Sequence, residues 1–195
     1  MAATRVKPDY FEAHFNLAKA YTRQERLTDA IREFSVVLQI NPGHVEAHYN
    51  LGIAYSKQGD IAKAIREYLI ATTIDPDYFM AHNNLANAYL SLGRTGDAIR
   101  EYEQAIQIDP GYTIVHYNLG LTYAAEGRTA DAIEEFATSI KLDPGFYQAH
   151  YALGVAYRMQ GRSEEAMLAF QTTLRLHPDH QDAKKELAGI RGMLK

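Results

Sequence analysis

Five of the eight histidines recur at a fixed interval, and imidazole is the side chain in this sequence best suited to metal binding or acid–base chemistry. These histidines stand 34 residues apart: His14, His48, His82, His116 and His150. Zinc holds its nitrogen ligands at about 2.0–2.1 Å, whereas equivalent residues on stacked helical units lie about 8 Å or more apart. We therefore interpret the column as structural, with each histidine packed and hydrogen-bonded between helices.

Other residues that could do chemistry do not form a reaction centre. The pairs His44/His48 and His177/His180 have helical ligand spacing, but each spans a proline turn and lacks a third ligand, so only adventitious metal binding is expected. The sequence has no cysteine, phosphate-binding glycine loop, nucleophile elbow or pair of catalytic carboxylates. Arg-Glu dipeptides such as Arg32-Glu33 are interpreted as solvated helix faces. The sequence predicts neither an enzyme nor a bound cofactor or metal.

A second column consists of carboxamides, whose donors and acceptor match the C=O and N–H groups of an extended peptide. Its members are Asn16, Asn50, Asn84 and Asn118, and Ala152 takes the next place in the column. Asparagine is a mediocre helix former, so four of them in mid-helix favour a role in binding. The alternative is that repeat duplication copied the column without selection.

All six prolines share this period, and they define the elements that must position both columns. The prolines are Pro8, Pro42, Pro76, Pro110, Pro144 and Pro178. The period predicts a repeat protein with units at 11–44, 45–78, 79–112, 113–146 and 147–180. Residues 181–195 are expected to be a capping helix with Ala183, Leu187 and Ala188 at core positions. Residues 1–10 are expected to be a leader or the remnant of a preceding repeat.

Each unit reads as two helices. In the second unit, Ala47, Leu51, Gly52 and Tyr55 mark the buried stripe of the first helix. Glycine at the turn suits a left-handed residue, although Glu25 stands there in the first unit. The second helix is expected to end before the proline, because a residue preceding proline avoids helical geometry. We expect an all-α, right-handed solenoid of antiparallel helix pairs.

Small residues recur where the two helices of a unit must approach closely. In the first helix they are Ala18, Gly52, Ala86, Gly120 and Gly154, and in the second Ala30, Ala64, Ala98, Ala132 and Ala166. Together with Tyr68 and Pro76 in the second unit, this pattern resembles the tetratricopeptide repeat over about nine-tenths of the chain. The motif Ala-His-x-Asn-Leu-(Gly/Ala), at 47–52 and 81–86, further resembles the repeats of O-linked N-acetylglucosamine transferase.

Positions are counted from the first residue of each unit. The resemblance implies that positions two, five, six, nine, twelve and thirteen of the first helix line a concave groove, where an asparagine ladder holds a bound protein segment. The candidate peptide-binding residues are Asn16, Asn50, Asn84, Asn118, Phe15, Tyr49, Tyr117, Tyr151, Lys19, Asn87 and Leu121. Basic residues gather early in the chain, at Lys19, Arg23 and Lys57, and apolar groove positions follow later. The expected ligand is therefore acidic or polar at one end and hydrophobic at the other. Basic residues are missing from positions two, five and six, which disfavours the carboxylate clamp for chaperone tails.

Composition narrows the class of partner. The net charge of -4 argues against nucleic acid, and no apolar run approaches membrane-spanning length. We expect a cytoplasmic adaptor that binds a protein or peptide. Self-assembly into a homo-oligomer and service as the substrate-recruiting region of a larger enzyme, such as a glycosyltransferase, remain open alternatives.

Overall fold

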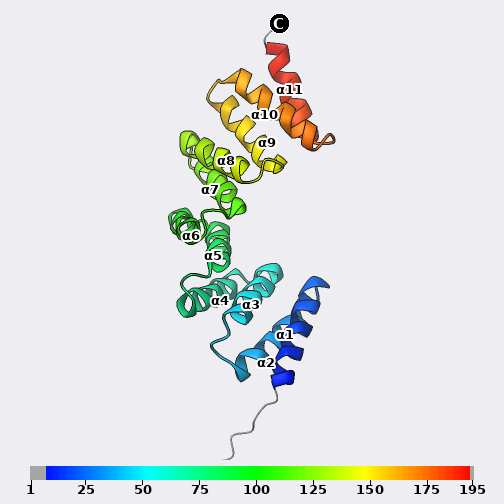
Figure 1. The fold of residues 1–195 in the computed structure, drawn as a ribbon, viewed down its shortest axis with the longest axis vertical. Helices are drawn as coiled ribbons and strands as arrows, with labels where there is room; N and C mark the ends of the chain where they lie inside the picture. The colour runs from blue at the N-terminus through cyan, green and yellow to red at the C-terminus, as the bar shows by residue number, and fades with distance from the viewer. Residues whose placement is uncertain (1–7, 194–195) are drawn as a thin grey trace, which may run out of the picture. The chain divides into compact units, whose positions relative to one another are not determined.

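The computed structural model describes residues 8–193, and this part of the chain forms eleven α-helices and no strand (Figure 1). The chain divides into two compact units, Met1–Ile108 and Asp109–Lys195. The first unit contains α1 (Pro8–Arg23), α2 (Leu27–Ile40), α3 (Val45–Gln58), α4 (Ile61–Ile74), α5 (Phe79–Ser91) and α6 (Thr95–Ile108). The second contains α7 (Thr113–Ala125), α8 (Thr129–Leu142), α9 (Tyr147–Met159), α10 (Ser163–Leu176) and α11 (Gln181–Met193).

Within each unit, every helix packs against the next helix in the chain, which confirms the expected all-α architecture of helix pairs. Residues 1–7 of the expected leader lie outside the described residues, and Pro8–Tyr10 form the first turn of α1. A helix of the length and apolarity needed to cross a bilayer is not found among the described residues.

The turn inside each helix pair adopts the left-handed geometry that the glycines predicted. Gly59, Gly93, Gly127 and Gly161 have φ between 70° and 88°, and Glu25 keeps the same turn at φ 58°. After Gly59, the N–H of Asp60 donates to the carbonyl of Tyr55 at 2.9 Å, which satisfies a carbonyl at the helix end. The residue that follows the glycine is the N-cap, and the second helix begins one residue later.

In four of the five pairs, an arginine after this turn contacts both helices of the pair. In the third pair, the guanidinium of Arg94 lies 4.3 Å from the ring centre of Tyr89 and its Nε donates to Asp97 at 2.6 Å. The same arrangement recurs at Arg26, Arg128 and Arg162. Each cation therefore ties the last turn of one helix to the first turn of the next.

The core of each pair is a contact between a small residue and an aromatic ring. A Cβ built on Gly52 would lie 2.5 Å from the Tyr68 ring, and one built on Gly120 would lie 2.6 Å from the Phe136 ring. The alanines that face them from the second helix, such as Ala64 and Ala132, are fully buried. The expectation that small residues allow this close approach is confirmed.

The last helix, α11, packs on α10 through Ala183, Leu187 and Ile190. The assignment of Ala188 to this core is wrong, because Ala188 is exposed and Ile190 fills the buried position. The two residues lie on different faces because a helix turns by about 100° at each residue.

Candidate functional site

The predicted site residues all lie on the first helices of the pairs: α1, α3 and α5 in the first unit, and α7 and α9 in the second. They do not present a uniform exposed row. Asn16 is exposed, whereas Asn50, Asn84 and Asn118 are half-buried. The side-chain amide of Asn50 donates to the carbonyl of Glu46 in its own helix at 2.7 Å, so one of its two N–H donors is already used.

The aromatic residues proposed as anchors also belong partly to the core. The ring centre of Tyr117 lies 6.0 Å from that of Phe136, and Tyr151 lies 5.7 Å from Phe170. Burial raises the pKa of both tyrosines, so their phenols stay protonated. Each ring packs against an aromatic ring on the second helix of its pair and remains half-exposed.

Lys19 is engaged rather than available. Its ammonium lies 3.0 Å from Oε1 of Glu46 and 5.1 Å from the ring centre of Phe15. The basic character expected near the start of the chain is therefore partly neutralised at this residue.

A polar pocket of about 230 Å³ lies where α3, α4 and α5 meet. Its lining consists of Ile53, Ser56, Lys57, Tyr68, Asn84 and Asn87. The structure thus brings Asn84 and Asn87 together with Lys57, and all of the lining except Tyr68 falls at helix positions six, nine, twelve or thirteen. Sequence reasoning missed Ser56, although it stands at the twelfth position, and it placed Tyr68 only in the core.

An apolar pocket of about 190 Å³ lies between α7, α8 and α9 in the second unit. Its lining consists of Tyr117, Leu121, Ala124, Phe136, Tyr151, Ala152, Val155, Ala156 and Met159. Leu121 and Met159 are exposed at its rim, to 42% and 58%. Ala152, the residue that interrupts the asparagine column, supplies part of this apolar wall.

A third surface lies on α4, away from the first helices. Ala62, Ile65, Leu69, Ile70 and Ile74 line a shallow apolar depression of about 400 Å³ together with Arg66 and Thr73. Leu69 and Ile74 are exposed. Nothing in the sequence pattern singled out this face, because its residues have the same helical spacing as core residues.

The histidine column forms the hydrogen-bonded contacts between helices that were expected of it. Nδ1 of the histidine lies 2.5–2.7 Å from a glutamate nineteen residues later. The pairs are His14–Glu33, His48–Glu67, His82–Glu101 and His116–Glu135. In the fifth helix pair, α9 and α10, Ala169 stands where the other pairs have the glutamate. The ring of His150 there bonds to the carbonyl of Pro144.

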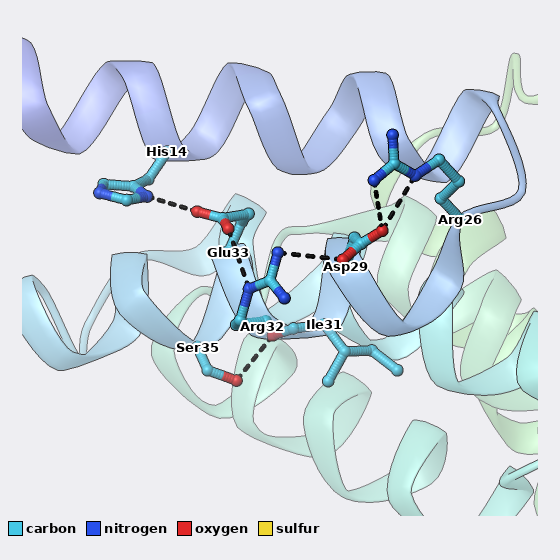
Figure 2. Close-up of polar contacts among 7 residues, drawn as sticks. All are labelled: His14, Arg26, Asp29, Ile31, Arg32, Glu33 and Ser35. Carbon is cyan, nitrogen blue, oxygen red and sulfur yellow. Dashed lines mark hydrogen bonds and ion pairs between the residues drawn. The ribbon is translucent and has the colours of Figure 1, made fainter.

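These pairs correct the interpretation of the Arg-Glu dipeptides as solvated faces. In Figure 2, Glu33 turns toward His14 while Arg32 reaches back to Asp29, and Asp29 in turn pairs with Arg26. Glu33 is 8% exposed, whereas Arg32 is exposed. The arginines are solvated as expected, but the glutamates turn inward because each meets a histidine.

Two histidines considered as adventitious metal ligands act as helix caps. Nδ1 of His44 accepts from the N–H of Ala47 at 3.0 Å, and Nδ1 of His180 accepts from the N–H of Ala183 at 3.2 Å. In the described part of the chain, no three or more histidine, aspartate or glutamate side chains are grouped so as to hold a metal ion.

Comparisons with known proteins agree with this geometry. Models described as "TPR repeat" match residues 19–59, 54–93 and 86–127, and a model described as "Tetratricopeptide repeat" matches residues 117–181. A search of curated protein sequences finds no significant match.

Solved structures resemble the chain over most of its length. A crystal structure of MamA is 28% identical, with a TM-score of 0.76, over 83% of this chain and 94% of that one. YrrB, described as "a TPR protein with an unusual peptide-binding site", is 22% identical with a TM-score of 0.72, over 88% of this chain and 89% of that one. A tetratricopeptide repeat protein from Parabacteroides merdae is 18% identical with a TM-score of 0.80, over 95% and 74%.

Proposed function

Since this chain belongs to the tetratricopeptide repeat family, we propose that it is a non-catalytic adaptor that binds an extended segment of another protein along its first helices. One observation carries the proposal: the pockets on the first helices of both units are lined mainly by the helix positions that face ligands in this family. We assign one repeat to each helix pair, and we expect the adaptor to act in the cytoplasm.

The chemistry of the pockets defines the ligand. The first unit offers amides, hydroxyls and one ammonium group, whereas the second offers aliphatic and aromatic carbon. The pocket of the first unit is expected to select polar or acidic residues, and the pocket of the second unit is expected to select a hydrophobic side chain. An aliphatic side chain gains about 1.5–3 kcal/mol when it is fully buried, so the apolar pocket is expected to supply most of the affinity.

In this proposal the asparagines of the column do not all contact the ligand equally. Asn84 opens on the polar pocket, whereas Asn50 already donates to Glu46. The likeness of 47–52 and 81–86 to repeats of O-linked N-acetylglucosamine transferase supports main-chain recognition by these amides. We propose that Asn118 holds the ligand backbone, that Asn84 contacts the ligand in the polar pocket, and that Asn50 contributes least.

Selection of peptides from a random display library, followed by calorimetric titration, tests the proposal. Peptides with a hydrophobic residue should bind, and Leu121→Ser should weaken them by about tenfold because it removes an apolar contact. Leu168→Ser changes an exposed leucine on α10, outside both pockets, and is the matched control. Failure to select any peptide, or equal binding by the Leu121 and Leu168 variants, would contradict the proposal.

The apolar face of α4 favours self-association as the second candidate function. Exposed Leu69 and Ile74 both line the shallow apolar depression on this helix, and exposed apolar patches mark protein interaction sites. Light scattering at increasing concentration separates the two functions. A constant mass supports the adaptor, whereas growth that Leu69→Glu abolishes supports assembly.

A further inference from the structure

The polar pocket between α3, α4 and α5 contains hydrogen-bond donors from several side chains. Oδ1 of Asn84 accepts from Nδ2 of Asn83 at 3.1 Å, and Oδ1 of Asn87 accepts from the buried hydroxyl of Tyr102 at 2.5 Å. Each carboxamide oxygen thus accepts one bond within the protein and keeps a second acceptor site. The donors that Asn84 and Asn87 can offer to the pocket are their NH2 groups.

Hydroxyl groups extend this donor surface. The Tyr68 hydroxyl interacts with both Asn84 and Ser56, which links side chains from three helices. Burial raises the pKa of Tyr68, so its phenol remains protonated and keeps a proton to donate. No carboxylate is among the six residues that line the pocket.

Lys57 is the positively charged residue among the six that line the pocket. Lys57 pairs with the carboxylate of Glu25, with Nζ and Oε1 3.8 Å apart, and the Glu25 side chain is 81% exposed. A contact of that length between exposed side chains is a weak ion pair, which a better-placed anion can displace. Lys57 therefore lines the same pocket as two carboxamides and two hydroxyls and has no strong internal counter-ion.

We propose that this pocket binds one carboxylate of the partner segment, with Lys57 supplying the charge and Asn84, Asn87, Ser56 and Tyr68 supplying hydrogen bonds. The assignment rests on the proposed function, because it gives the chemistry of one ligand residue. A carboxylate has about four acceptor sites, so it can accept from the ammonium, amide and hydroxyl groups of this lining. Hydrogen bonds to a charged acceptor are also stronger than those to a peptide carbonyl. The carboxylate comes from an acidic side chain or from a chain end.

Nuclear magnetic resonance on the full chain tests this with three small probes. N-acetyl-glutamate amide carries a side-chain carboxylate, N-acetyl-alanine carries a main-chain carboxylate, and N-acetyl-glutamine amide is neutral. At least one acid should shift the side-chain NH2 signals of Asn84 and Asn87, with about tenfold tighter binding than the neutral probe. The stronger acid identifies the source. Equal binding of acids and glutamine amide, or no shift at these two residues, overturns the proposal.

Variants localise the effect. Lys57→Met should weaken the acid probe by about tenfold, whereas Lys141→Met removes the same charge from α8 and should leave binding unchanged. Asn84→Asp is nearly isosteric and should abolish binding, because it places an anion in the pocket. Glu25→Gln should strengthen binding by about twofold by removing the competing carboxylate. Equal affinity of the Lys57 and Lys141 variants contradicts the assignment.

These results are independent of peptide selection. Acid binding at Asn84 and Asn87 together with failure to select any peptide would retain the carboxylate site and reject the adaptor. Selected peptides that bind without preference for an acid, and equally well to Lys57→Met, would retain the adaptor and reject the carboxylate site.

Discussion

Nδ1 of His48 lies 2.7 Å from Oε2 of Glu67, and the other ring nitrogen lies 2.9 Å from the carbonyl oxygen of Pro42. Both partners are acceptors, so the ring satisfies both bonds only when each nitrogen carries a proton. His82 and His116 have the same two kinds of partner. These contacts are therefore ion pairs between imidazolium and carboxylate.

We predict that the stability of the protein falls as the pH rises through the folded-state pKa values of these histidines. Burial lowers the pKa of His48 and His82, but the bonds to glutamate and to the proline carbonyl outweigh it, and the net pKa is raised. At His116 the bond to Glu135 is the largest effect and also raises the pKa. A raised folded-state pKa gives stability that is fully present below the unfolded value of about 6.5 and is lost above the folded value. Thermal unfolding from about pH 6 to about pH 9 measures this loss.

The control for this prediction replaces Glu67, Glu101 and Glu135 with glutamine. The triple variant should show a flatter dependence of melting temperature on pH over the same range, and an unchanged slope would refute the ion pairs. His44 acts in the opposite sense below this range. Burial lowers its pKa, and the stability from its neutral cap is lost as the pH falls below about 6.5.

Ala169→Glu should stabilise the protein, because it restores the missing partner of His150. The His150 ring already bonds to the Pro144 carbonyl at 3.1 Å, and Ala169 stands nineteen residues later, as the other glutamates do. We expect a gain of about 1 kcal/mol in the free energy of unfolding near pH 6. Denaturant titration measures it. The gain should disappear when His150→Ala is combined with Ala169→Glu, whereas a gain that survives would show that the new glutamate acts without the histidine.

Gly52→Ala should destabilise the protein despite the higher helix propensity of alanine. The new Cβ would lie 2.5 Å from Cε1 and 2.7 Å from Cδ1 of Tyr68, so the ring must move. Overpacking of this kind costs about 1–3 kcal/mol, which should lower the melting temperature. Gly189→Ala on α11 is the matched control, since its Cβ meets nothing within 4 Å. The control should be stabilised by about 0.5–1 kcal/mol, and two variants of equal stability would contradict the packing argument.

Glu25→Gly should stabilise the first helical hairpin. Glu25 is the only residue other than glycine with positive φ in the described part of the chain, and its equivalents in the other pairs are glycines. Relief of the left-handed conformation is worth about 1 kcal/mol after the greater unfolded-state entropy of glycine is counted. Chemical denaturation should show this increase, and Glu25→Ala should not. A stabilised alanine variant would mean that the charge, rather than the backbone, is responsible.

Most of the fold follows from local rules that the repeated residues expose. Each of these rules depends on backbone sterics or on side-chain volume. Pro76 therefore predicts the end of a helix, Gly59 predicts a left-handed turn, and Gly52 predicts a close contact with an aromatic ring. Glu25 obeys the turn rule too, because the turn imposes left-handed backbone geometry on a residue that disfavours it.

The site was less predictable, because polar side chains choose among several partners. Helical position placed Asn50 correctly, but whether its amide faces a ligand or the carbonyl of Glu46 depends on local competition. Glu33 was assigned to solvent because it follows exposed Arg32, and only the pairing of α1 with α2 brings it to His14. The donor character of the polar pocket depends likewise on Tyr102, a core residue of another helix.

Each bond from a histidine ring to a proline carbonyl adds a third segment to the contact between two helices. His48 on α3 holds Glu67 on α4 and the loop that leads in from α2, through Pro42. Alkali would therefore weaken each of these hairpins together with the loop that precedes it, because a neutral imidazole keeps only one of its two N–H donors.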